Sequence, residues 1–283
     1  MTGVFGHETP ERAQPVSGSG DHGALFGISL QEVVDQLREA GCVFAEDEAG
    51  LLAEAAADRV ELNALIVRRI GGEPLEYILG WAEFCGLRVR VGPGVFVPRR
   101  RTAFLVALGA SLVAGRGHPV VVDVCCGSGA IAAALATRVP EAELYATDID
   151  AAAVACAREN LAGAGAVMLG DLFSALPAGL RGRVDLLVAN APYVPTAAIE
   201  TMPREARLHE ARATLDGGQD GLDLHRRIAA EASDWLRASG SLLLETSDVQ
   251  AARTADLVSR AGFTAVIERS ERFDATVVTG TLS

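Results

Sequence analysis

Four consecutive residues, Asn190, Ala191, Pro192 and Tyr193, follow an apolar run that begins at Val184. The Asn190 side-chain oxygen and the Ala191 backbone carbonyl can each accept one N–H bond from a planar amide or amino group. Pro192 has a fixed φ and biases Ala191 toward an extended conformation, while Tyr193 offers an aromatic face to a flat group. The nitrogen of such a group is a poor nucleophile. The four residues therefore predict a site that holds this nitrogen for methyl transfer rather than one that deprotonates it.

A second cluster lies where a buried strand is expected to turn into a helix, and it consists of Asp123-Val124-Cys125-Cys126-Gly127-Ser128-Gly129. Its backbone N–H groups and the helix N-terminus can bind a ligand, and its glycines let the backbone approach that ligand closely. Asp148 ends the next predicted strand, where its carboxylate can bind two ribose hydroxyls. Asp171 ends the third, where it can accept a hydrogen bond from an adenine amino group. These positions predict a binding site for a cofactor that contains adenosine.

The spacing Gly127-x-Gly129-x-x-Ala132 also matches the fingerprint of dinucleotide-binding folds, which makes a nicotinamide enzyme an alternative. Asp123 argues against it, because a carboxylate inside the strand would crowd a pyrophosphate but could position the amino-acid end of S-adenosylmethionine. Hydride transfer also has no need of the Asn-x-Pro-Tyr segment. The expected cofactor is therefore S-adenosylmethionine.

Alternating strand and helix patterns around these residues predict an α/β fold with a Rossmann-like, doubly wound, mostly parallel sheet and an antiparallel edge. Strands are expected at residues 120–124, 144–148, 166–169, 184–190, 241–245, 264–268 and 275–280. Helices are expected at residues 130–139, 151–161, 223–237 and 249–261. This is the fold of class I S-adenosylmethionine-dependent methyltransferases.

The chain is expected to divide into four parts. Residues 1–24 mix Gly, Ser, Pro and charged residues without a period, which predicts a disordered leader. Residues 25–72 have apolar residues at helical spacing and are expected to form a small helical domain, with Ser29 and Glu32 capping its first helix. Residues 73–100 are expected to be a linker with a β-hairpin around Gly92-Pro93-Gly94, and residues 101–283 form the catalytic domain.

The composition limits the classes of protein to which the chain can belong. Its 283 residues are 49% hydrophobic, which is enough for a large core. The net charge is −12, from 25 basic residues, all Arg, and 37 acidic ones, so a broad nucleic-acid-binding surface is not expected. The five Cys residues lack a metal-ligand spacing, and no apolar run is typical of a membrane span or a signal peptide. These features indicate a protein of the reducing cytoplasm.

The motifs of the chain, taken in order, resemble those of one family. They are Gly72-Glu73-Pro74-x-x-Tyr77-Ile78-x-Gly80, Phe84-x-Gly86, Val97-Pro98-Arg99, the Asp123 to Gly129 loop, Asp171-Leu172-Phe173, Asn190-x-Pro192-Tyr193, Leu215 to Leu222, and Glu245. The set is similar to that of the HemK/PrmC family of protein-(glutamine N(5)) methyltransferases, from about Ile28 to the C-terminus. These enzymes modify the Gln of the Gly-Gly-Gln motif in class I peptide chain release factors, the proteins of translation termination. Their helical N-terminal domain helps to hold the release factor.

The resemblance implies a role for both clusters. It places S-adenosylmethionine against Asp123, Cys125, Cys126, Gly127, Ser128, Gly129, Asp148, Ile149, Asp171 and Leu172, with Asp148 at the ribose and Leu172 beside the adenine. The segment from Asn190 to Tyr193 would bind the substrate amide, and Asn190 would also lie near the methyl group of the donor. No metal ion and no covalent enzyme intermediate are implied.

Several departures from the family pattern leave other functions open. Ala191 stands where Pro is usual, Cys125 and Cys126 where Gly and Thr are usual, and Arg101 and Ala103 where acidic residues are usual. A divergent paralogue with another protein substrate, or a donor-binding protein without turnover, would account for them. A further alternative is an adenine-N(6) methyltransferase, which would use the same Asn-x-Pro-Tyr segment on a DNA or RNA base flipped out of its stack.

Overall fold

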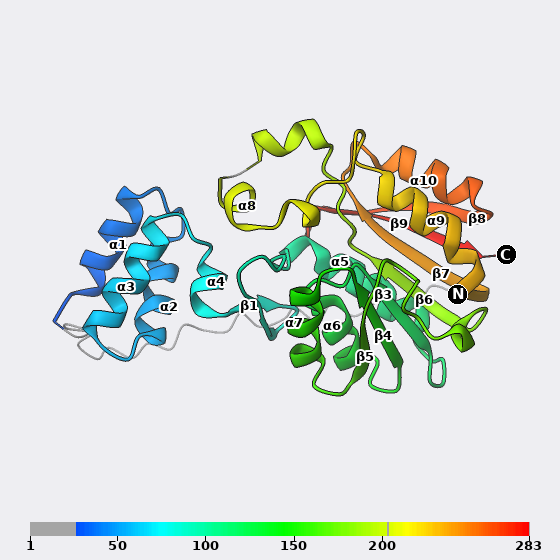
Figure 1. Ribbon diagram of the computed structural model, residues 1–283, viewed down its shortest axis with the longest axis horizontal. Coiled ribbons are helices and arrows are strands. Elements are labelled where there is room, and N and C mark those ends of the chain that lie inside the picture. The colour runs from blue at the N-terminus through cyan, green and yellow to red at the C-terminus, as the bar shows by residue number, and fades with distance from the viewer. Residues whose placement is uncertain (1–26, 203, 283) are drawn as a thin grey trace, which may run out of the picture. The chain divides into compact units, whose positions relative to one another are not determined.

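The structure is a computed structural model that describes residues 27–202 and 204–282 (Figure 1). The predicted leader, residues 1–24, lies outside the described residues. The chain divides into two compact units, with the boundary between Ile66 and Val67. This boundary falls inside a helix.

The N-terminal unit is helical and contains α1 (Leu30–Glu39), α2 (Ala45–Ala55) and the first part of α3 (Arg59–Ile70). The predicted cap of the first helix is confirmed. Ser29 Oγ accepts a hydrogen bond from Glu32 N at 3.2 Å, and Ser29 N donates to Glu32 Oε2 at 2.8 Å. These two bonds satisfy backbone groups of the first turn, which explains why the helix begins there.

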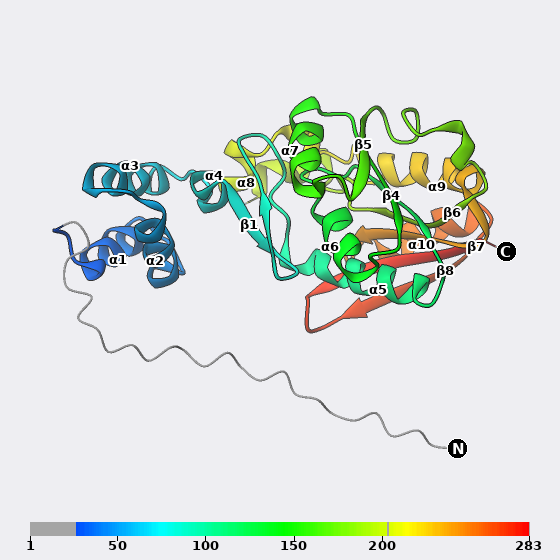
Figure 2. The same cartoon turned by 90° about the horizontal axis from the view of Figure 1, so that it is seen from below.

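A short β-hairpin precedes the large sheet, and its turn differs from the prediction. β1 (Trp81–Phe84) pairs antiparallel with β2 (Leu87–Arg90), so the turn residues are Cys85 and Gly86 (Figure 2). The prediction of a hairpin around Gly92-Pro93-Gly94 is wrong. Cys85 and Gly86 have φ of 53° and 81°, and two left-handed residues form the tight turn whose twist matches that of paired strands.

The second unit is built on a seven-stranded sheet with the strand order β5-β4-β3-β6-β7-β9-β8. β3 to β7 are parallel, and β9 is antiparallel to both of its neighbours. The predicted doubly wound, mostly parallel sheet with an antiparallel edge is confirmed. The strands are β3 (Val120–Val124), β4 (Glu143–Asp148), β5 (Gly165–Leu169), β6 (Val184–Ala189), β7 (Leu236–Thr246), β8 (Phe263–Ser270) and β9 (Ala275–Leu282).

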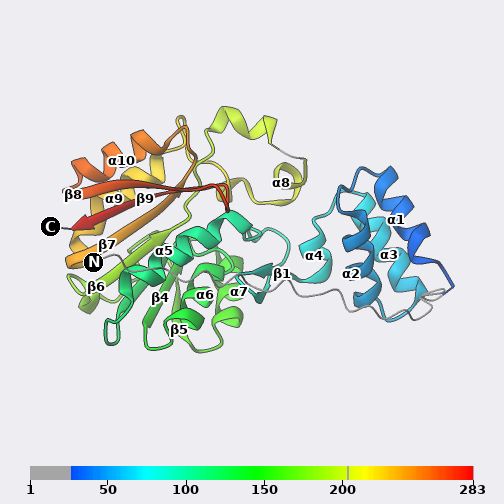
Figure 3. The same cartoon turned by 180° about the vertical axis from the view of Figure 1, so that it is seen from behind.

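Helices cover both faces of this sheet (Figure 3). On one face Leu105 of α5 and Leu135 of α6 pack with Val121, and on the other Ile228 of α9 packs with Val122. Alternate residues of β3 therefore enter two cores, as expected for a parallel strand buried on both sides. The helices of this unit are α4 (Leu75–Leu79), α5 (Ala103–Val113), α6 (Ala130–Arg138), α7 (Ala151–Leu161), α8 (Arg204–His209), α9 (Asp223–Trp235) and α10 (Ala251–Arg260).

Candidate functional site

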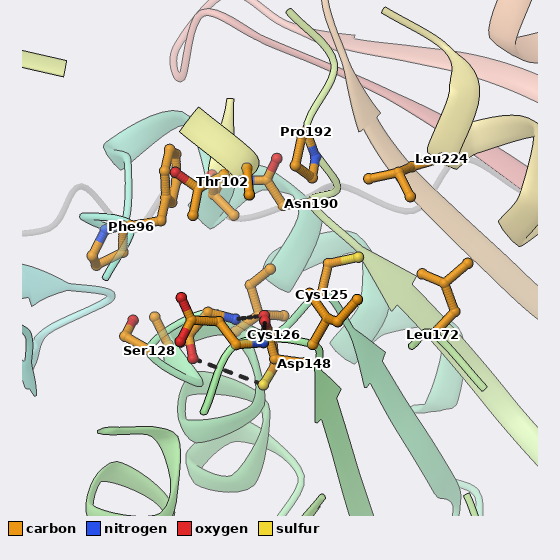
Figure 4. A pocket seen from close by; sticks show the side chains of 18 of the residues that line it. Phe96, Thr102, Cys125, Cys126, Ser128, Asp148, Leu172, Asn190, Pro192 and Leu224 are labelled. Carbon is orange, nitrogen blue, oxygen red and sulfur yellow. Dashed lines mark hydrogen bonds between the residues drawn. The ribbon is translucent and has the colours of Figure 1, made fainter. Parts of the chain in front are cut away.

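A cavity of about 250 Å³ lies at the carboxyl ends of β3, β4, β5 and β6 (Figure 4). In doubly wound sheets, ligands bind outside this edge. The structure brings most of the predicted site residues together in its lining, namely Cys125, Cys126, Gly127, Ser128, Asp148, Ile149, Asp171, Leu172, Asn190 and Pro192. The two clusters of the sequence analysis thus share one cavity.

The other four predicted residues lie outside this lining. Asp123 is fully buried inside β3, and Ala191 is buried in the core with 1% of its surface exposed. A side chain at Gly129 would lie 2.9 Å from Ala157 Cβ, so the glycine allows α6 to approach α7 closely. Tyr193 lines a neighbouring, more open groove together with Arg101.

The loop after β3 is held by backbone hydrogen bonds. Cys126 N donates to Thr147 O at 3.0 Å, and Gly127 N donates to Asp148 Oδ2 at 2.8 Å. The other carboxylate oxygen of Asp148 accepts from Asp150 N at 2.9 Å. Burial raises the pKa of Asp148, and these backbone donors oppose the rise. Asp148 thus fixes the shape of the loop while its carboxyl group lines the cavity.

The two thiols of this loop are neutral at physiological pH. Burial raises the pKa of Cys125 and of Cys126 well above the usual range, and the negative charges of Asp148 and Asp123 add to the rise. A thiol must be deprotonated to act as a nucleophile. Cys125 and Cys126 therefore contribute shape to the cavity rather than reactivity.

Asp123 is a buried carboxyl group behind the loop. Its Oδ2 accepts from Ala132 N at 3.2 Å, whereas its Oδ1 has no hydrogen-bond partner among the described residues. Burial raises the pKa of Asp123 to about 8, which keeps the side chain protonated at neutral pH. An unpartnered oxygen at this depth is suited to receive a polar group of a ligand.

Two further groups come from the segments after β5 and in α9. Asp171 forms an ion pair with Arg227 of α9 at 2.7 Å, and both residues line the cavity. Leu172 is buried, and its carbonyl accepts from Thr147 Oγ1 at 2.7 Å. This end of the cavity combines an apolar side chain with a carboxylate, which suits a flat base that has an amino group.

Asn190 directly follows β6, and its amide group has a defined partner. Asn190 Nδ2 donates to Thr102 Oγ1 at 3.3 Å, and both residues line the cavity. Figure 4 shows Asn190, Thr102 and Pro192 on one side of the cavity and Asp148, Ser128 and Cys126 on the other.

Tyr193 is held by its hydroxyl group. The hydroxyl donates to Glu245 Oε1 at 3.4 Å, and Arg101 Nε donates to the same oxygen at 3.3 Å. Burial raises the pKa of Tyr193 to about 12, and the negative charge of Glu245 adds to this rise. The ring therefore remains a neutral phenol.

Two parts of the chain pack against the segment from Asn190 to Tyr193, namely Gln250, which immediately precedes α10, and the loop at Gly217. Gln250 Nε2 donates to the carbonyl of Tyr193 at 2.9 Å and to that of Asp220 at 3.1 Å. A side chain at Gly217 would lie 2.8 Å from the carbonyl oxygen of Pro192, so only glycine lets the loop pack this closely. Close packing thus explains why position 217 of the Gly217-Gly218-Gln219 sequence is glycine. The side chain of Gln219 is exposed.

Comparison with known proteins identifies the family. The model of the Methyltransferase small domain matches residues 87–221. The release factor glutamine methyltransferase of Geobacter sulfurreducens is 41% identical over 204 residues, which cover 71% of this chain and 70% of that protein. The release factor glutamine methyltransferase of Bradyrhizobium diazoefficiens is 34% identical over 288 aligned positions, which cover 94% of this chain and 95% of that protein. The chain belongs to the release factor glutamine methyltransferase family.

Solved structures agree with this family's fold. A 16S rRNA methyltransferase from T. thermophilus, in complex with AdoMet and guanosine, has a TM-score of 0.51 at 20% identity, covering 72% of this chain and 50% of that one. A methyltransferase from Pyrococcus furiosus also has a TM-score of 0.51, at 17% identity over 69% and 89% of the two chains. The predicted class I methyltransferase fold is confirmed.

The family's members are S-adenosylmethionine-dependent enzymes, and S-adenosylmethionine is the cofactor of this chain. The residues of the cavity fit this group. The carboxyl group of Asp148 and the backbone of the Cys125 to Gly129 loop offer polar partners, and Leu172 offers an apolar surface. The unpartnered Oδ1 of Asp123 lies behind the same loop.

Sequence reasoning missed several lining residues, namely Phe84, Phe96, Pro98, Thr102, Ala130, Ile131, Asp150, Ala213, Thr214, Leu224 and Arg227. Some had a local signal: Pro98 belongs to the Val-Pro-Arg motif, Phe96 immediately precedes it, and Thr102 follows three positions after it. Ala213 and Thr214 had none. Among the described residues, no helix combines the length and the apolar character that crossing a membrane requires.

Proposed function

We propose that this protein transfers a methyl group from S-adenosylmethionine to the side-chain amide nitrogen of the glutamine in the Gly-Gly-Gln motif of class I release factors. The proposal includes recognition of the release factor by the helical residues 25–72 and a cytoplasmic location. The observation that carries it is Asn190, an amide that lines the cavity opposite Asp148 and the loop after β3. The relatives at 41% and 34% identity are named for this reaction.

The chemistry of the acceptor explains the residues around it. An amide nitrogen is a poor nucleophile, so it must be oriented rather than deprotonated. Asn190 Oδ1 would accept one of its N–H bonds and the Ala191 carbonyl the other, which directs the nitrogen lone pair toward the cavity. Bound S-adenosylmethionine supplies an activated methyl group. Alignment of this kind can lower a barrier by about 7–11 kcal/mol.

The apolar residues of the lining have a separate task. Phe96, Pro98 and Leu224 belong to the same cavity lining as Asn190. Apolar side chains exclude water, and a hydrogen bond is electrostatically stronger in such surroundings than in water. The acceptor amide would therefore be held by few but strong contacts.

The test uses the full chain, S-adenosylmethionine and the class I release factor of the same organism. We expect a mass increase of one methyl group, mapped by peptide mass spectrometry to the glutamine of the Gly-Gly-Gln motif. The matched control is a release factor with glutamate in place of that glutamine, which should stay unmodified. Donor binding by calorimetry without any modified release factor peptide would contradict the proposal.

A further inference from the structure

The hydroxyl group of Thr102 lies between the Asn190 amide and a buried carboxylate. Thr102 immediately precedes α5 and is 2% exposed. Its Oγ1 accepts a hydrogen bond from Asn190 Nδ2 at 3.3 Å. Its hydroxyl also interacts with the carboxyl group of Glu245, which is 1% exposed and belongs to β7.

The carboxyl group of Glu245 is buried and surrounded by hydrogen-bond donors. Burial raises the pKa of Glu245, and the neighbouring side chains of Thr102, Arg101 and Tyr193, together with the positive charge of Arg101, oppose the rise. Arg101 and Tyr193 both donate to Oε1, whereas Oε2 has no hydrogen-bond partner among residues 27–202 and 204–282. The free lone pairs of this carboxylate are therefore the natural acceptor for the one proton of Thr102.

This arrangement determines which end of the Asn190 amide, Nδ2 or Oδ1, faces Thr102. A carboxylate only accepts hydrogen bonds, and a threonine hydroxyl has a single proton. If that proton is donated to Glu245, Thr102 presents a lone pair to Asn190. The lone pair selects the Nδ2 group of Asn190, and Oδ1 is then turned the other way.

We propose that Thr102, supported by Glu245, is a positioning residue that fixes the Asn190 amide with its oxygen available to the acceptor nitrogen. This inference rests on the proposed function, because the orientation is useful only if the acceptor presents an N–H bond. A flipped amide would place N–H against N–H, which is repulsive. The Asn190 amide has two orientations of nearly equal shape, and the hydroxyl of Thr102 disfavours the one in which Nδ2 faces the acceptor.

The role of Arg101 follows from the same contacts. The resemblance of the motifs implies an acidic residue at this position, but the chain has Arg101, whose guanidinium forms an ion pair with Glu245. A second carboxylate at this position would push a proton onto Glu245. A protonated Glu245 could itself donate to Thr102, and Thr102 would then no longer select Nδ2 of Asn190. The positive charge of Arg101 favours the ionised form of Glu245, which the positioning of Asn190 requires.

The experiment compares Thr102→Val, Thr102→Ser and Thr254→Val in the full chain. Thr254 is the matched control, since it is equally buried but its hydroxyl contacts His225 and Thr246. For each variant we measure kcat/KM for the release factor, the Kd for S-adenosylmethionine and Tm. Thr102→Val should lower kcat/KM by up to about 100-fold, the effect of slight misplacement of a reacting group. The Kd of the donor should stay unchanged, and Thr102→Ser should keep most of the activity.

A structural role alone would give a different result. The inference is overturned if Thr102→Val is as active as Thr254→Val, if Thr102→Ser loses as much as Thr102→Val, or if donor affinity falls with activity. A double variant adds a further criterion. Introduced into Asn190→Ala, Thr102→Val should cause no further loss, because residues that act through one group are not additive.

A readout without turnover separates this inference from the proposed function. The side-chain amide NMR signal of Asn190 should be protected from hydrogen exchange in the wild type and in Thr102→Ser, and unprotected in Thr102→Val. If the wild type makes no product from the release factor, the proposed function fails, and exchange that is equal in all three proteins would overturn the inference.

Discussion

The two sides of the cavity are built by different means. On the side that we propose binds the donor, the loop after β3 offers backbone groups. Two hydrogen bonds set the position of this loop, from Cys126 N to Thr147 O and from Gly127 N to Asp148 Oδ2. On the proposed acceptor side, the group that faces the cavity is a side chain, Asn190, whose amide donates a hydrogen bond to another side chain, Thr102. A backbone-built site depends on the path of the chain, whereas a side-chain-built site depends on the identity of each residue.

This difference accounts for three of the departures from the motifs that the sequence resembles, those at Cys125, Cys126 and Ala191. On the donor side, Cys125 and Cys126 replace the usual Gly and Thr, yet the loop still closes on Thr147 and Asp148. On the proposed acceptor side, Ala191 also differs from the resembled motif, and the proposed working group there is the backbone carbonyl. At Cys125, Cys126 and Ala191, the side chain is thus not the proposed functional group.

The largest effect is expected for Asn190→Ala. This change removes the only side-chain amide from the lining of the cavity that the described residues form. Turnover should fall by a factor on the order of 10²–10³, the range seen when one preorganised hydrogen-bonding group is removed from a catalytic site. The measurement is single-turnover methylation of the release factor by mass spectrometry.

Donor binding is the control for that variant. If the two sides of the cavity are separate in function, the Kd of S-adenosylmethionine for Asn190→Ala should stay close to that of the wild type in calorimetry. Full activity in this variant, or a parallel loss of donor affinity, would contradict the separation of the two sides.

The fold was largely predictable because its elements carry local signals. The strand from Val184 and the helix from Ala151 have an apolar pattern that local sequence is enough to identify. Two elements were not predictable in this way. α5 is apolar on most sides and so shows no helical period, and the hairpin turn lies at Cys85, a residue type that rarely adopts a positive φ.

The site was predictable where residues belong to motifs at strand ends, as for Asp148 and Asn190. The partners of these residues come from distant parts of the chain. Thr102 and Asn190 are 88 positions apart, and Gln250 reaches back 57 positions to Tyr193. Such pairs depend on how the sheet and its loops close, which no local pattern records.

The next largest effect concerns stability on the donor side and uses Asp123→Asn. Asp123 has a pKa of about 8 in the folded protein, raised first by burial, and about 3.9 when unfolded. Between these values the folded state holds one more proton than the unfolded state, so wild-type stability falls as pH rises. The slope is about 1.4 kcal/mol per pH unit, and it ends once the pH exceeds the folded pKa.

Asparagine resembles the protonated form of Asp123 in shape, but its side chain does not titrate, so it adds no pH dependence to stability. The stability of Asp123→Asn relative to the wild type should therefore increase by about 1.4 kcal/mol from pH 6 to pH 7. Denaturant titrations of both proteins without donor at the two pH values measure this difference. A difference that does not change with pH would show that Asp123 is ionised in the folded protein.

The smallest effect tests whether the donor loop depends on the path of its backbone. Cys125 has a φ of 58°, in the left-handed region where a side chain costs roughly 1–2 kcal/mol. Cys125→Gly should therefore be more stable than Cys125→Ala by about 1 kcal/mol, after the greater flexibility of unfolded glycine is taken into account. Both variants lose the same thiol, so the comparison isolates the backbone.

Cys126 provides the matched control, since it lies next in the loop, is buried, and is absent from the residues with positive φ in the described part of the chain. There the order should reverse, and Cys126→Ala should be more stable than Cys126→Gly by about 0.5–1 kcal/mol. Thermal unfolding of the four variants gives both differences. The same order at both positions would mean that side-chain packing, rather than backbone conformation, governs the donor loop. The contrast with the acceptor side would then disappear.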